Sequence, residues 1–235
     1  MARKRTGALA PHREAGSGVV PIGGDLVKVD AIYHVPSVHP KAEGPWTAEA
    51  DKVAWVDGMS GLACIIRRKP GSGVLGGYVA VPPGHPLFGW QPEALLGLGL
   101  QVHGGTISYA ASCERTAPEE VSICHTVTHP VPEQRLFAND AALGLDPGDH
   151  GDDAWWFGFE CDQPYDVRPG VGRDHAAPSA LDGVNRREYR DMGYVHRECV
   201  RLAAQLGSIG EGRDPAAAIV DAGGAVGYDP RRARR

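Results

Sequence analysis

The sequence lacks both the long apolar run of a membrane-spanning helix and the basic excess that is typical of nucleic-acid-binding proteins. Spanning a bilayer takes about 20 consecutive apolar residues, and no stretch of this chain approaches that length. The formal net charge is −5, and basic residues cluster only at the two ends, in residues 3–5 and 231–235. We therefore expect no membrane insertion, and we consider nucleic acid an unlikely partner.

Cysteine is sparse, and its spacing matches no common motif. The chain has five cysteines and no CxxC pair, which excludes a zinc ribbon and a thioredoxin-like redox motif. The N-terminal stretch carries positive charge but has no apolar segment behind it, unlike a secretory signal. The sequence therefore predicts a cytoplasmic protein whose cysteines are free thiols.

Repeats are also absent. The 32 glycines and 19 prolines among 235 residues follow no period, which excludes collagen-like and repeat architectures and indicates many turns and long loops. Hydrophobic residues make up 42% and charged residues 23%, as in an ordinary globular domain with a real core. We expect a disordered basic tail at 1–24, one domain at 25–207 with a long insertion at about 110–153, and a flexible tail at 208–235.

What the sequence does contain is a series of short apolar stretches separated by turn residues. These predict strands at 26–36, 53–57, 61–67, 74–81, 98–109 and 155–161. Apolar residues at steps of three and four predict one long helix over 186–206, with Gly207 as its stop. Crossover helices that would alternate with the strands are missing. The predicted fold is α+β: a mostly antiparallel sheet of about five to six strands with one long C-terminal helix packed on it.

The first candidate site is the segment 102–108, VHGGTIS. Two glycines after His103 leave its imidazole uncrowded and let a ligand approach the backbone of Gly104 and Gly105, as in an oxyanion pocket or a phosphate cradle. Ser108 adds a hydroxyl, and His85 could line the same pocket. The G-x-S-x-G elbow of α/β-hydrolases is absent. The alternative is a bulged strand whose histidine is simply hydrogen-bonded.

The second candidate site lies at the end of the aromatic strand 155–161, WWFGFEC. Glu160, Asp162 and Asp166 bring three carboxylates, next to the thiol of Cys161, to the point where a buried strand opens into a loop. Together with a histidine, such carboxylates bind Mg²⁺ or Mn²⁺ or act as general acid and base. A divalent metal is therefore the cofactor that this pattern would use. The alternative is a set of solvated turn residues.

A third cluster lies in the insertion. It combines Cys113 and Cys124 with His125 and His129, and these are residue types that bind zinc. Their spacing matches no established zinc motif, so an incidental cluster is the alternative.

The order of several motifs resembles a group of uncharacterised proteins encoded in bacteriophages and actinobacterial genomes. The resemblance spans about residues 50–206 and includes the stretches GYVAVP, GHPL, VHGGTIS, WWFGFECD and YRD followed by YV and Glu198. It implies a phage or mobile-element accessory role and carries no assigned activity. In that group a histidine and a later aspartate often follow the cysteine. Here Asp166 matches the aspartate but the histidine is missing, which weakens the case for metal-dependent chemistry.

These observations support two functions from different classes. The first is a small hydrolase or transferase that acts on a polar or phosphorylated small molecule. His103 would be its general base or a ligand to the substrate, and Asp162 with Glu160 or Asp166 would have to converge on that histidine.

The alternative is a non-catalytic binding protein that modulates a host or partner protein. It predicts an exposed aromatic patch around Phe88 and Trp90. A structural virion component is less favoured because the chain has no coiled-coil heptads and no repeats. The sequence leaves the oligomeric state open.

Overall fold

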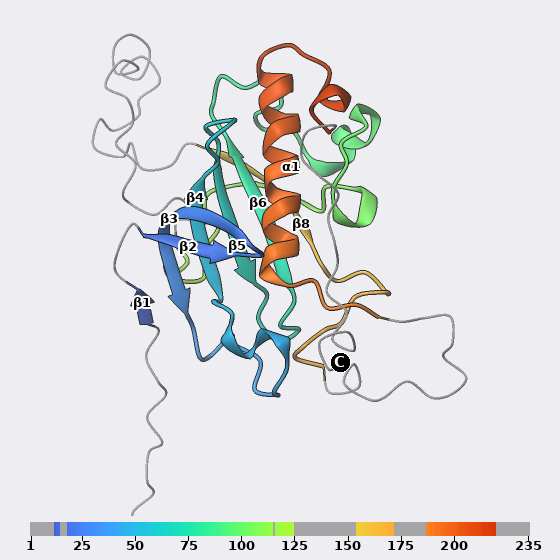
Figure 1. Ribbon diagram of the computed structural model, residues 1–235. Helices are drawn as coiled ribbons and strands as arrows, with labels where there is room; N and C mark the ends of the chain where they lie inside the picture. The colour runs from blue at the N-terminus through green and yellow to red at the C-terminus, as the bar shows by residue number, and fades with distance from the viewer. Residues whose placement is uncertain (1–11, 15–17, 115, 125–153, 172–186, 220–235) are drawn as a thin grey trace, which may run out of the picture.

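The computed structural model describes residues 12–14, 18–114, 116–124, 154–171 and 187–219. In this part of the chain an antiparallel sheet carries one long helix on one face (Figure 1). The elements are β1 (His12–Glu14), β2 (Val19–Ile22), β3 (Asp25–His34), β4 (Lys52–Val56), β5 (Ala63–Arg68), β6 (Leu75–Val81), β7 (Tyr109–Ser112), β8 (Trp155–Glu160) and the helix α1 (Met192–Gly210). The predicted α+β class is confirmed.

The sheet has more strands than the five to six that we predicted. Its strand order is β1-β3-β4-β5-β6-β8-β7, and β2 pairs with β3 beside this path. β2 falls within residues 1–24, where we expected a disordered basic tail. Every residue of β6 is buried, because α1 covers one face of the sheet and loop segments cover the other.

Two apolar clusters fill the space on the two faces. On the helix side, Phe157 and Phe159 from β8 pack with Leu202 from α1. On the opposite side, Trp156 and Tyr78 pack with Ile123 from the loop after β7. Successive residues of a strand point to opposite faces, so the aromatic run of β8 serves both clusters.

The helix α1 begins later than the predicted start at residue 186. Asp191 is its N-cap, and the Asp191 carboxylate accepts a hydrogen bond of 2.7 Å from the backbone N–H of Tyr194. Before it, Glu188 forms a parallel bridge with Asp166 in the loop after β8. Gly207 does not end the helix, which continues to Gly210.

The predicted strand over 98–109 is wrong. This stretch follows the 3₁₀ helix η2 (Pro92–Leu98) and contains the short 3₁₀ helix η3 (His103–Gly105), and β7 begins only at Tyr109. Gly99, Gly104 and Gly105 have φ values of 65°, 76° and 82°. Such left-handed backbone turns the chain sharply and is incompatible with a continuous strand.

The prediction of free thiols is wrong for two of the five cysteines. Cys113 and Cys124 form a disulfide with a Cα–Cα distance of 4.8 Å, whereas Cys64, Cys161 and Cys199 are free and buried. The disulfide occupies both cysteines of the suggested zinc cluster, and 125 and 129 lie outside the described residues. Among the described residues no helix is long and apolar enough to cross a membrane.

Candidate active site

The centre of the candidate site is a buried pair formed by His103 and Asp166. His103 lies in η3, and Asp166 lies in the loop after β8. The His103 Nε2 is 2.6 Å from the Asp166 Oδ2, and the two side chains are 3% and 1% exposed. An ionised carboxylate can only accept hydrogen bonds, so His103 carries its proton on Nε2 and donates it to Asp166.

The other ring nitrogen of His103 contacts the helix α1. Its Nδ1 is 2.8 Å from the Tyr194 hydroxyl. In the tautomer with the proton on Nε2, the unprotonated Nδ1 accepts a hydrogen bond that the Tyr194 hydroxyl donates. Asp166, His103 and Tyr194 therefore form a continuous hydrogen-bonded chain across three separate elements.

Arg190 contacts both end residues of this hydrogen-bonded chain, Asp166 and Tyr194. The Arg190 Nε donates a hydrogen bond of 2.9 Å to the second carboxylate oxygen of Asp166. Its guanidinium also lies over the Tyr194 ring, 4.7 Å from the ring centroid. Burial raises the pKa of the Tyr194 hydroxyl, and the nearby Glu198 carboxylate raises it further, whereas Arg190 lowers it. The guanidinium thus favours negative charge both on the Asp166 carboxylate and on the Tyr194 hydroxyl.

Glu198 is a second buried carboxyl group beside the chain. It follows Tyr194 by four residues on α1 and therefore lies on the same face of the helix. The Glu198 Oε1 is 3.4 Å from the Nη1 of Arg201. The Glu198 Oε2 is buried without a hydrogen-bond partner in the described structure. Burial raises the pKa of Glu198, and the charge of Arg201 together with the backbone N–H of His103 opposes that shift.

The rim of the site is more exposed than its centre. Tyr165 is 46% exposed, and its ring meets the His103 ring edge-on with 5.7 Å between centroids. Gly104 and Gly105 are exposed too. The flexible Gln163 side chain lies against Gly104, with its amide nitrogen 2.7 Å from the position of a Cβ, and the φ of 76° favours glycine there.

The other predicted residues do not join this centre. Glu160 pairs with Lys69, and the Asp162 Oδ2 lies 3.7 Å from the same Lys69 amine. The side chain of Cys161 packs in the helix-side core. Phe159 of β8 packs in the same core, so by strand alternation Glu160 points to the opposite face of the sheet. Of the three predicted carboxylates, the structure brings only Asp166 to His103.

His85 also lies apart from His103. The His85 Nε2 is 2.9 Å from the carbonyl oxygen of Leu206, and its Nδ1 accepts from the backbone N–H of Leu87. Leu206 follows Tyr194 by twelve residues, which is about 18 Å along a helix. Ser108 is exposed, and its backbone N–H donates to the carbonyl oxygen of Gly158 in β8.

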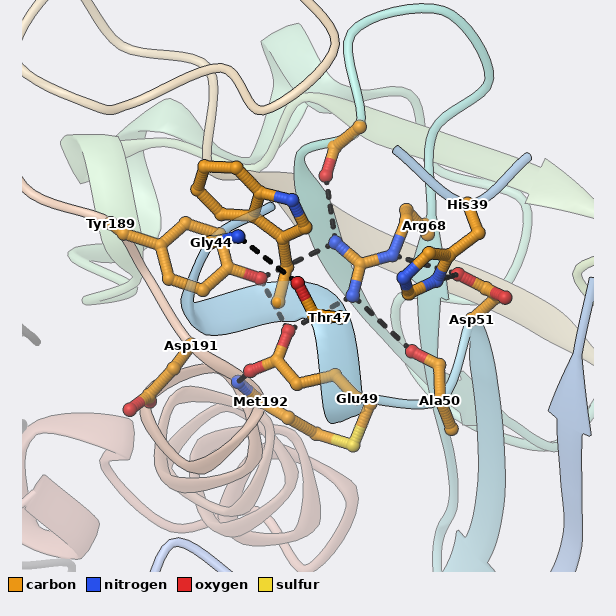
Figure 2. A network of polar contacts seen from close by, with 12 residues as sticks. His39, Gly44, Thr47, Glu49, Ala50, Asp51, Arg68, Tyr189, Asp191 and Met192 are labelled. Carbon is orange, nitrogen blue, oxygen red and sulfur yellow. Dashed lines mark hydrogen bonds and ion pairs between the residues drawn. The ribbon is translucent and has the colours of Figure 1, made fainter. Parts of the chain in front are cut away.

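A second buried network fixes the segment that carries Arg190 and Tyr194. Figure 2 shows Arg68 at its centre. The Arg68 guanidinium donates to Asp51 at 2.9 Å and to Glu49 at 2.9 Å, and Tyr189 also donates to Glu49. The second oxygen of Glu49 accepts from the backbone N–H of Met192 at 2.9 Å. This carboxylate therefore ties the first turn of α1 to β5, and it suits the positive end of the helix dipole.

Sequence reasoning missed two members of the site as functional residues, Tyr194 and Glu198, whose only signal was their place in the motifs that carry the phage-protein resemblance. For Arg190 the sequence favoured a solvated helix face, with contact to an anionic ligand as the alternative. Among the described residues no group of three or more His, Cys, Asp or Glu side chains is placed to hold a metal ion. No family model matches the chain, and neither a curated protein nor a solved structure matches it.

Proposed function

We propose that this protein is a hydrolase or transferase that acts on a polar or phosphorylated small molecule by acid–base chemistry. The observation that carries the proposal is the buried chain Asp166–His103–Tyr194. A base that is held by a carboxylate on one side and bonded to a hydroxyl on the other is the general arrangement of an activated nucleophile or acid–base group.

Each residue has a distinct role in this proposal. The Tyr194 hydroxyl passes its proton to the Nδ1 of His103 as it takes a proton from the substrate. Both transfers then run in reverse, which returns a proton to the leaving group and restores the two residues. Asp166 holds the imidazole in the tautomer that can accept this proton, and its negative charge stabilises the resulting imidazolium. Arg190 lies over the Tyr194 ring, where its charge favours a developing phenolate and an anionic substrate.

The rim supports a small polar ligand. Tyr165 offers an exposed aromatic face directly beside His103. The exposed backbone at Gly104 and Gly105 allows close approach because neither residue has a side chain. These features suit a planar or phosphorylated molecule better than a long polymer. Gly104, Gly105 and the exposed Ser108 are the proposed ligand contacts, whereas His85 bonds to the carbonyl of Leu206 and lies outside the site.

The test is a screen of chromogenic carboxylic and phosphate esters with the purified protein and its Tyr194→Phe variant. General acid–base groups contribute about 10²- to 10⁴-fold to the rate, and we expect a loss in that range for Tyr194→Phe. Tyr109→Phe is the matched control, because Tyr109 packs against Tyr78 on the opposite face of the sheet. Equal turnover by both variants, or no turnover by the wild type, would sink the proposal.

A non-catalytic binding protein is the second candidate, and one observation favours it. Trp90 and Leu96 are 41% and 65% exposed within one short stretch around η2. The Phe88 ring packs on the Trp155 ring with 6.0 Å between centroids. Large exposed apolar side chains that lie together mark protein contacts. A pull-down from host lysate in which wild type and Trp90→Ser capture the same proteins would argue against this function.

The biological setting rests on the resemblance alone. We propose an accessory role in a phage or another mobile element, located in the cytoplasm, for either function. Expression of the chain during phage growth, compared with the Tyr194→Phe variant, would show whether such a role depends on the site.

A further inference from the structure

The buried carboxylate of Asp51, which directly precedes β4, holds the same kinds of partner as that of Asp166. Asp166 accepts hydrogen bonds from a histidine, an arginine and one backbone N–H. Asp51 accepts the same three kinds of hydrogen bond, from His39 at 2.8 Å, from Arg68 at 2.9 Å and from the backbone N–H of Val35 at 2.7 Å. Figure 2 shows His39 and Arg68 beside this carboxylate. The described structure therefore contains a second histidine that a buried aspartate holds by one ring nitrogen.

The two histidines differ at the other ring nitrogen. In His103 both nitrogens are bonded and the side chain is 3% exposed. The His39 side chain is 23% exposed, although that of Asp51 is only 2% exposed. Within the described part of the chain no group bonds to the His39 Nε2, and this atom is not buried. A carboxylate can only accept a hydrogen bond, so the neutral ring of His39 carries its proton on Nδ1 and presents the lone pair of Nε2 to solvent.

The loop after β3 fixes the place of His39 before any ligand arrives. The backbone N–H groups of Val38 and His39 both donate to the carbonyl oxygen of Val35, at 2.8 and 2.9 Å. The same Asp51 side chain then holds the Val35 N–H at one oxygen and the His39 ring at the other. Hydrogen bonds of this kind fix the tautomer and the orientation of a histidine whose other nitrogen reacts. A pair that served only to fasten the turn would need Nδ1 alone.

We propose that His39 is a phosphoryl-accepting site, at which Nε2 takes a phosphoryl group from a small donor that carries a good leaving group. Histidine forms covalent intermediates of this type. A carboxylate on the opposite nitrogen stabilises the positive charge that the ring acquires. The phosphoryl oxygens balance that charge and repel hydroxide, whereas water would rapidly hydrolyse an acyl group on a ring that is open to solvent. The proposed site shares no residue with the one at His103.

Phosphoramidate is the simplest donor for this reaction. The Nε2 lone pair attacks the phosphorus and forms a new N–P bond. The P–N bond of the donor breaks, and its electron pair leaves on ammonia. The ring keeps its Nδ1 proton and becomes positively charged beside the Asp51 carboxylate. No oxidant or reductant takes part.

The test is a timed exposure of the folded protein to potassium phosphoramidate in weakly basic solution, with N-acetylhistidine in the same tube. Peptide mass spectrometry measures the rate at each histidine, and ¹H–³¹P correlation spectra identify the modified nitrogen. A carboxylate behind a metal-binding histidine is worth about 10- to 100-fold, and we expect His39 to react about tenfold faster than N-acetylhistidine, on Nε2. Reaction on Nδ1, or a rate no higher than that of N-acetylhistidine, would overturn the proposal.

Two matched variants test the part of the carboxylate. Asp51→Asn should lower the His39 rate about tenfold, whereas Asp162→Asn removes a half-exposed carboxylate elsewhere and should leave it unchanged. An Asp51→Asn rate equal to that of wild type would also overturn the proposal. Labelling of the buried His85 and His103 reports unfolding of a variant. If Asp51→Asn unfolds, the comparison of wild type with N-acetylhistidine decides.

Discussion

Asp166 is the residue that holds the candidate site together. Its carboxylate accepts from His103, from Arg190 and from the backbone N–H of Gln163 at 3.0 Å. Each of these donors lies in a different part of the chain, so the loss of one carboxylate disturbs η3, the loop after β8 and the segment before α1 together. A buried carboxylate with three donors is stable because its charge is paired and its oxygens are saturated.

Asp166→Asn tests this assignment. The amide nitrogen cannot accept a hydrogen bond, so one donor loses its partner, and Arg190 keeps only Glu188 of its two carboxylate partners. Breaking a buried ion pair costs about 3–5 kcal/mol, and we expect a loss of that order in the free energy of unfolding in urea. The control is Asp162→Asn, whose side chain is 40% exposed, and a change below about 1 kcal/mol is expected there. Equal losses of stability in the two variants would contradict the claim that Asp166 holds the site together.

Glu198 gives a prediction about pH. Its folded-state pKa is raised above the ordinary value of 4.5 by burial, so the folded chain holds this proton more tightly than the unfolded chain does. As the pH rises from 4.5 through the folded-state pKa, ionisation of the buried group therefore lowers the free energy of unfolding. Glu198→Gln keeps the shape but has no proton to lose, so its stability relative to wild type should increase over that range. A difference between the two proteins that does not change with pH would contradict this.

At the scale of the elements, the helix α1 depends on a close approach between two glycines. A side chain at Gly193 would place its Cβ 2.4 Å from the Cα of Gly23 in the turn between β2 and β3. The hairpin can therefore lie directly on the first turn of the helix, as Figure 1 shows for β2 and α1. Gly23 itself has a φ of 60°, which favours glycine at that turn.

Gly193→Ala should therefore destabilise the protein. The added methyl group meets backbone rather than a flexible side chain, and forced overpacking of this kind costs about 1–3 kcal/mol. Gly207→Ala is the control within the same helix. Its Cβ would lie 3.3 Å from that of Ser60, a tight contact that Ser60 has to relieve by a few tenths of an ångström, and alanine gains about 1 kcal/mol of helix propensity over glycine, so we expect a clearly smaller loss there than in Gly193→Ala. Thermal unfolding of both variants decides the point. A Gly193→Ala protein as stable as Gly207→Ala would mean that the hairpin does not rest on α1.

The elements also show why part of the fold could be predicted and part could not. The strands β4, β5, β6 and β8 have local apolar patterns bounded by turn residues, and each was located to within about two residues. The start of α1 was misplaced although the apolar residues that recur at steps of three and four begin only at Met192, directly after the N-cap at Asp191. The stretch 98–109 was wrongly predicted as a strand because its apolar residues favour one. The left-handed backbone of its three glycines interrupts any strand there.

At the scale of the whole molecule, the contacts that define the site join positions far apart in the sequence. His103 and Asp166 were both chosen as candidates from local signals, but the bond between them spans 63 residues. Tyr194 appeared only in the motif that carries the phage-protein resemblance, and a solvated helix face was the favoured interpretation for Arg190. The Cys113–Cys124 bond could not be predicted either, because the pairing of cysteines cannot be deduced from spacing alone.

The protonation of His103 tests the central claim most directly, and its measurement needs no substrate. In a long-range ¹⁵N–¹H correlation spectrum near neutral pH, the His103 signals are identified by their loss in His103→Gln. The account predicts a proton on Nε2, bonded to Asp166, and an unprotonated Nδ1 whose ¹⁵N shift moves in Tyr194→Phe. A proton on Nδ1, or ring signals that do not respond to Tyr194→Phe, would contradict it.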